Sequence, residues 1–176
     1  VSEWEDILRD FGERCPFTSS YDISMEHFIP SSIGHGGTIK GNVYPIHPAL
    51  NASKNNANPF LWKATLSPFQ QKQFEQVVDY LAEQNNLTVD EFRDYVFWCF
   101  SNPRTKKDIV RDQQKGVRTS LALWKKARNL EEQKERVLSY FAAQYHLTEV
   151  PLFVQFADWC ITQNLPLESS TFSTYV

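Results

Sequence analysis

Cysteine is scarce in this chain of 176 residues, and the three that occur, Cys15, Cys99 and Cys160, lie far apart. Because no CxxC pair is present, the sequence offers neither a disulfide framework nor a four-cysteine zinc site. We therefore expect no structural zinc. Scattered, unpaired cysteines are also typical of a cytoplasmic protein.

Long hydrophobic runs are missing as well, since no apolar stretch approaches the ~20 residues that cross a bilayer. The first residues, VSEWEDILRDF, lack the charged-then-apolar layout of a secretory signal. We expect a cytoplasmic protein with no membrane partner. Hydrophobic residues make up 41% of the chain, which is enough to bury a core and argues against disorder over any long span.

Glycine is rare, and four of the six glycines lie between residues 34 and 41. The sequence changes character near Trp62: before it come short β-branched or aromatic stretches, and after it apolar residues recur three and four apart. This change predicts an α+β protein with a small mixed domain over residues 1–62 and a mainly helical domain over 63–176.

The first domain has the local signals of a strand–loop–strand–helix unit. A short helix is expected over Glu3–Phe11, and a strand over Tyr21–Pro30 that Pro30 closes. The glycine-rich stretch Ser31–Gly41 disfavours helix and strand interiors and predicts a loop. A second strand over Asn42–Ile46 follows, and Pro48 can open a helix that runs to Lys54. The predicted order is ββα.

The helical half contains an internal repeat. YLAEQNNLT, from Tyr80, matches YFAAQYHLT, from Tyr140, at five of nine positions. We expect two related helical hairpins, at about residues 70–102 and 131–164, each with a Trp-Cys pair in its second helix. Core packing is the expected role of these pairs.

Positive charge is concentrated between the hairpins, where Arg104–Arg128 carries a net charge of +7 and the remaining chain −10. Such segregation is typical of a surface that faces phosphate groups, although a solvated helix face is the alternative. The candidate nucleic-acid-binding residues in this segment are Lys106, Lys107, Arg111, Lys115, Arg118, Lys125 and Lys126.

Three short motifs in the ββα unit resemble those of the HNH endonucleases, also called ββα-metal or His-Me finger nucleases. They are EHFIP at Glu26–Pro30, GNVYPI at Gly41–Ile46 and NASK at Asn51–Lys54. The spacing of nine residues between Asn42 and Asn51 is similar to that in the HNH domain of RNA-guided CRISPR nucleases. The resemblance extends over Cys15–Pro59.

The resemblance implies a role for each motif position. His27 matches the general base that deprotonates the attacking water, and Asn42 matches the asparagine that braces the loop and the base. Glu26 and Asn51 match the metal ligands, with Mg²⁺ or Mn²⁺ as the implied ion. The enzymes of this family hydrolyse phosphodiester bonds in DNA, so the resemblance implies that DNA is the partner.

Three further residues are weaker candidates for contact with DNA. Lys54 lies three residues after Asn51 on the same helix face and can reach a phosphate. His47 can contact nucleic acid or simply cap the helix before Pro48. His35 is a loop residue that can lie near the DNA.

The sequence also departs from the family pattern. Glutamate replaces the commoner aspartate before the histidine, and strict strand alternation would send Glu26 and His27 to opposite faces.

We expect a phage, restriction or mobile-element nuclease. The alternatives are a catalytically silent DNA-binding or assembly module of the same fold and a ribonuclease or toxin nuclease. The helical domain could bind a second copy of the chain or a protein partner.

Overall fold

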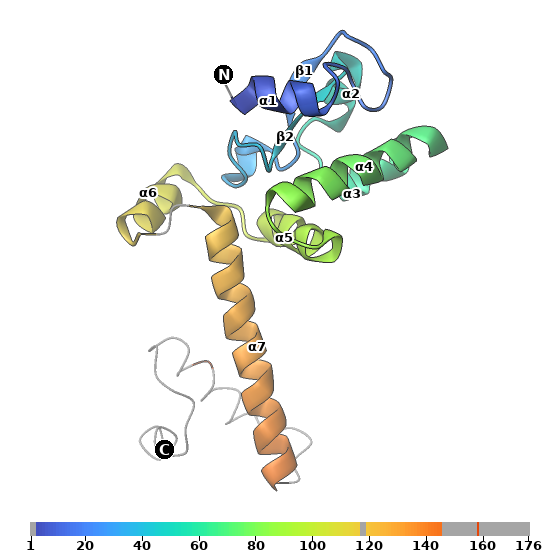
Figure 1. Cartoon of the computed structure of the whole chain (residues 1–176). Coiled ribbons are helices and arrows are strands. Elements are labelled where there is room, and N and C mark those ends of the chain that lie inside the picture. The colour runs from blue at the N-terminus through green and yellow to red at the C-terminus, as the bar shows by residue number, and fades with distance from the viewer. Residues whose placement is uncertain (1–2, 117–118, 146–157, 159–176) are drawn as a thin grey trace. The chain divides into compact units, whose positions relative to one another are not determined.

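The computed structural model describes residues 3–116, 119–145 and 158, and its fold is α+β with a predominance of helix. The predicted fold class is confirmed at this level. The elements in chain order, shown in Figure 1, are α1 (Glu3–Asp10), β1 (Ser24–His27), the 3-10 turn η1 (Ser31–Ile33), β2 (Val43–Ile46), α2 (Pro48–Lys54), α3 (Pro59–Trp62), η2 (Lys63–Thr65), α4 (Pro68–Gln84), α5 (Val89–Ser101), α6 (Lys106–Gln114) and α7 (Ser120–Tyr145).

The two strands form one antiparallel pair in which Glu26 lies opposite Tyr44 and His27 opposite Val43. The first strand is shorter than the predicted range 21–30. It can pair only with the four residues of β2, because the chain turns into α2 directly afterwards. The order strand, loop, strand, helix follows the prediction, and Figure 1 shows α2 beside the strand pair.

Local sequence signals explain where the helices begin. A capping box starts α4 at Ser67, α5 at Thr88 and α6 at Thr105, and each satisfies amide groups that a first helical turn leaves unpaired. The short helix α2 begins with Pro48 after His47, whose ring accepts a hydrogen bond from the Ala49 amide. These caps fix the helix starts without tertiary contacts.

One hydrophobic core joins the strand pair to the helices. The Phe28 ring is fully buried, and its centroid lies 5.7 Å from that of Phe74 in α4 and 5.4 Å from that of Phe92 in α5. Residues 1–124 accordingly form one compact unit and residues 125–176 a second. The division between compact units therefore does not coincide with the predicted domain boundary at residues 62 and 63.

The predicted helical hairpins have different outcomes. Helices α4 and α5 pack against each other across a four-residue connection, within the range expected for the first hairpin. In the range of the second, α7 continues as a single helix to Tyr145, and residues 146–157 and 159–176 lie outside the described part. No helix among the described residues is long and apolar enough to span a membrane.

Candidate active site

The end of β1 and the facing side of α2 meet in a buried ion pair. The Lys54 ammonium lies 2.5 Å from Glu26 Oε1 and donates a second hydrogen bond to the His27 carbonyl oxygen at 2.9 Å. The Lys54 side chain is 0% exposed and that of Glu26 10% exposed. Burial raises the pKa of Glu26 and lowers that of Lys54, and the attraction between the two charges opposes both shifts.

Asn51 lies on the same face of α2, one turn before Lys54. Its Nδ2 donates to Ser24 Oγ at 3.0 Å and weakly to the Met25 carbonyl at 3.5 Å. Ser24 and Glu26 share one face of β1 because strand side chains alternate. The two proposed metal ligands, Glu26 and Asn51, are therefore both at the interface between β1 and α2.

His27 is the last residue of β1 and is half-buried. Its Nε2 lies 2.8 Å from the Thr38 hydroxyl oxygen in the loop between the strands. Glu26 thus contacts α2 whereas the His27 ring contacts the loop, as strand alternation predicts. Among the described residues none hydrogen-bonds to Nδ1 of His27.

Asn42 braces the loop that carries Thr38. Its carboxamide accepts a hydrogen bond from the Ile29 amide at 2.8 Å and donates to the carbonyls of Ile29 at 3.0 Å and Gly37 at 2.8 Å. Asn42 is 1% exposed. These contacts hold the backbone at Ile29 and Gly37, and the role that the resemblance implies for Asn42, bracing both the loop and the base, stays a prediction.

Residues far along the chain also hold the loop. The Arg104 amide donates to the Ile33 carbonyl at 2.9 Å, and the Arg104 guanidinium donates to the Gly34 carbonyl at 3.0 Å. On another side, Asn85 donates to the Gly41 carbonyl at 2.8 Å. Neither residue carries a sequence signal for this role, because both contacts depend on how the helices pack.

The weaker histidine candidates have structural contacts. The His47 ring caps α2 and lies 3.8 Å from an Asp22 carboxylate oxygen. His35 is buried at 3% exposure, and its Nε2 donates to the Asn102 carbonyl at 2.6 Å. Burial lowers the pKa of His35, which favours the neutral ring. His35 is therefore part of the packing rather than of an exposed loop.

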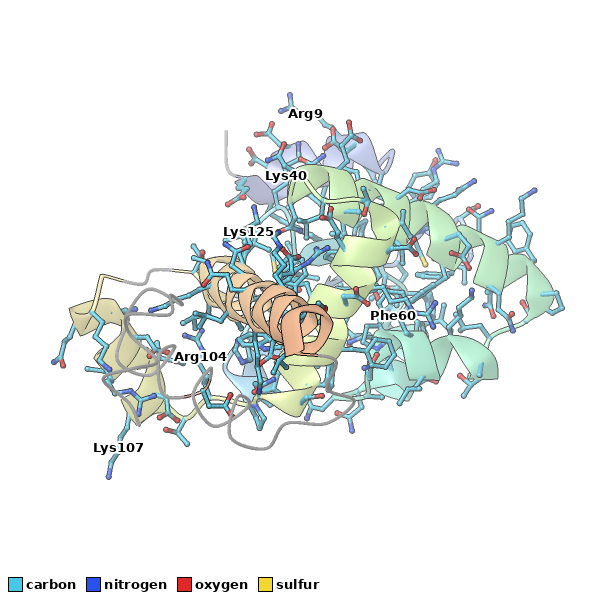
Figure 2. The ribbon with its side chains drawn as sticks, turned by 90° about the horizontal axis from the view of Figure 1, so that it is seen from below. Arg9, Lys40, Phe60, Arg104, Lys107 and Lys125 are labelled. Atoms are coloured by element: carbon cyan, nitrogen blue, oxygen red, sulfur yellow. The ribbon has the colours of Figure 1, made fainter. Side chains whose placement is uncertain are left out.

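The candidate phosphate-binding lysines are divided between buried and exposed positions. Lys54 is buried against Glu26, so its ammonium offers no exposed atom to a phosphate in this conformation. Lys106 and Lys107 are exposed, and Lys107 projects away from α6 in Figure 2. Arg111 is exposed and pairs with Asp108 at 3.0 Å.

The other predicted basic residues lie elsewhere. Lys115 is exposed just after α6, and Lys125 and Lys126 are exposed on α7 in the second compact unit. Arg118 lies outside the described residues. On α6 itself, Lys106, Lys107 and Arg111 line a shallow hollow of about 330 Å³.

The two residues predicted to bind Mg²⁺ or Mn²⁺, Glu26 and Asn51, lie where β1 meets α2. Glu26 provides a buried carboxylate that already has a cation, the Lys54 ammonium, as its partner. Mg²⁺ is commonly held by one or two carboxylates together with waters and substrate phosphates, so a large protein cluster is not required. Within residues 3–116, 119–145 and 158, three or more His, Cys, Asp or Glu side chains nowhere gather as metal ligands.

No family model matches the sequence, and no curated protein and no solved structure matches it either. The contacts described above are therefore the basis for any functional proposal.

Proposed function

We propose that this chain is a metal-dependent DNA endonuclease with an HNH-type active site at the end of β1. The observation that supports the proposal is the placement of three candidate residues at the end of β1: Glu26 and Asn51 lie where β1 meets α2, and the His27 ring faces the adjoining loop that Asn42 braces. This set combines a base, a carboxylate and a carboxamide on a rigid frame.

His27 has the chemistry of a general base in this proposal. In the proposed tautomer Nε2–H donates to the Thr38 hydroxyl oxygen at 2.8 Å, which holds the ring in one orientation and leaves Nδ1 to take the proton of an attacking water. Positioned imidazoles of this kind contribute roughly 10²–10⁴-fold to a rate. Thr38 is a positioning residue, because it acts on the reaction only through His27.

Glu26 and Asn51 would hold the metal ion. When bound, Mg²⁺ would stabilise the negative charge that develops on the phosphate and the leaving oxygen. The carboxylate needs a nearby cation in any state, because an unpaired buried charge is strongly destabilising. In the structure the Lys54 ammonium supplies this charge, so a metal ion at Glu26 would have to share the carboxylate with it or replace it.

The exposed lysines of α6 are proposed to contact the DNA backbone. Neutralised phosphates release counterions, so each lost contact reduces the slope of log affinity against log salt by roughly one. The double variant Lys106→Met/Lys107→Met should lower that slope by about two. Lys72→Met, an exposed lysine on α4, is the control, and an unchanged slope in the double variant would argue against α6 as the contact.

A second candidate is a DNA-binding module of the same fold without catalysis. The contact that favours it is the Lys54–Glu26 pair, since the carboxylate is already neutralised by a lysine. A module of this kind would bind DNA and leave it uncut whatever metal is supplied.

One assay separates these functions. Supercoiled plasmid is incubated with the protein and Mg²⁺, Mn²⁺ or EDTA, and the products are resolved on a gel. We expect metal-dependent nicked or linear DNA, and about 100-fold or greater loss of cleavage in His27→Ala with DNA binding retained in a gel shift. Binding without cleavage in every metal would favour the silent module, and cleavage of an RNA of the same sequence in preference to DNA would favour a ribonuclease.

The matched control is His47→Asn. It removes an imidazole while keeping a side-chain oxygen that can cap α2, the role of His47 in the structure. Cleavage should survive this change. An equal loss of cleavage in His47→Asn and His27→Ala would contradict the assignment of His27 as the base.

A further inference from the structure

The proposed reaction leaves one charged residue of the site without a role. Lys54 is the most deeply buried charged side chain at the junction of β1 and α2, with 0% exposure. A buried lysine is costly unless its ammonium is fully paired, so its position needs a physical reason.

The ammonium lies between the Glu26 carboxylate and the backbone of His27. It bonds to Glu26 Oε1 at 2.5 Å and to the His27 carbonyl at 2.9 Å. Asn51, the other proposed ligand, precedes Lys54 by three residues on the same face of α2. Lys54 therefore provides the positive charge that a metal ion would otherwise provide to this carboxylate.

A divalent cation at Glu26 would approach that ammonium closely. Two like charges a few ångströms apart in a largely water-free site repel each other much more strongly than in water. Both cations would also need the same carboxylate oxygen, Oε1, or would have to divide the two oxygens between them. The Lys54 ammonium therefore reduces the occupancy of a divalent metal ion at the Glu26 carboxylate.

We propose that Lys54 is the resident counter-cation of Glu26 and lowers the affinity of this carboxylate for divalent metal ions. The inference rests on the proposed function only for the identity of the metal site. Its consequence is that the free protein binds Mg²⁺ or Mn²⁺ weakly at Glu26, and that removal of the lysine charge strengthens this binding.

The test is Mn²⁺ binding without nucleic acid, measured by electron paramagnetic resonance of the free ion and by calorimetry. Lys54→Met should bind one Mn²⁺ at least ten times more tightly than the wild type. Lys40→Met is the matched control, because Lys40 also pairs with a carboxylate, that of Asp10 at 2.7 Å, but on the surface. An equal gain in the control, or no gain in Lys54→Met, would overturn the proposal.

Two further variants address the location of the ion and the stability of the protein. Glu26→Gln/Lys54→Met should lose the gained Mn²⁺ site, and a gain that persists in this double variant would also overturn the proposal. Lys54→Gln retains an N–H donor without the charge, and it replaces Lys54→Met under the same criterion if the methionine variant does not fold.

The outcome is distinguishable from that of the plasmid assay. Equal Mn²⁺ affinity in wild type and Lys54→Met removes the inference whether or not the wild type cuts DNA. If the wild-type protein never cuts DNA, the proposed function is refuted, but the comparison of Mn²⁺ affinities still tests whether Lys54 lowers metal binding at Glu26.

Discussion

Asn42→Ala is expected to destabilise the protein by about 3 kcal/mol, for reasons that the hydrogen bonds of Asn42 make explicit. The side chain is 1% exposed and satisfies three backbone groups: the amide and carbonyl of Ile29 and the carbonyl of Gly37. Ile29 is itself fully buried, so water cannot easily replace the lost partner.

The magnitude follows from the groups left unpaired. An unsatisfied buried donor such as the Ile29 amide costs roughly 1–3 kcal/mol, and each lost hydrogen bond to a carbonyl about 1 kcal/mol. Together they give about 3–5 kcal/mol, and water that enters the space left by the carboxamide reduces this toward the lower end.

Urea unfolding followed by tryptophan fluorescence measures the free energy, and hydrogen exchange at the Ile29 amide measures the local effect. Asn56→Ala, at an exposed position, serves as the control with an expected change within about 0.5 kcal/mol. Asn42→Asp keeps the size and one acceptor but loses both donors and adds a buried charge, so it should cost at least as much as alanine.

A loss below about 1 kcal/mol in Asn42→Ala, with the Ile29 amide still protected, would refute this reasoning. So would an aspartate variant as stable as the wild type, because the two donated hydrogen bonds would then contribute nothing.

Three other outcomes are expected. Thr38→Val should lower the rate of single-turnover DNA cleavage about tenfold with DNA affinity unchanged, because the His27 ring loses its orienting hydroxyl. Thr38→Ser keeps a hydroxyl and should cleave at the wild-type rate. A serine variant as slow as the valine variant would contradict the positioning role of Thr38. Gly34→Ala should lower the midpoint of thermal unfolding more than Gly37→Ala. Both glycines have positive φ, but an added Cβ at Gly34 would lie 2.2 Å from the Arg104 carbonyl oxygen, whereas one at Gly37 would meet open space. Equal decreases in the two midpoints would show that the close approach at Gly34 is unimportant. Burial raises the pKa of Cys99 to about 12, so alkylation of Cys99 in the native protein, followed by peptide mapping, should be slow at pH 7 and still be increasing with pH at pH 9. A rate that levels off above the ordinary thiol pKa of about 8.5 would contradict that burial.

The order of elements in the ββα unit could be predicted because its signals are local. Pro30 and the glycines of residues 34–41 end the first strand, and Pro48 with its preceding histidine begins α2. Helical periodicity after Trp62 similarly predicted α4 and α5. The exact strand length was not predictable, since β1 extends only as far as β2 provides partners.

The assignments of function to His27, Glu26, Asn42 and Asn51 remain predictions, although their positions can now be compared. Strand alternation correctly indicated that neighbouring Glu26 and His27 would have different surroundings. The i,i+3 spacing indicated that Lys54 shares a face with Asn51, but not that its ammonium turns inward to a carboxylate 28 positions earlier in the chain.

The sequence by itself determined the order strand, loop, strand, helix in residues 24–54 and the set of polar residues available there, because caps and turns act within a few residues. Tertiary packing alone decided their partners. Lys54 with Glu26, Thr38 with His27 and Arg104 with the loop at Ile33 are joined across 28, 11 and 71 positions. The folded core brings each pair together, and burial makes an unpaired charge or amide costly enough to fix the pairing.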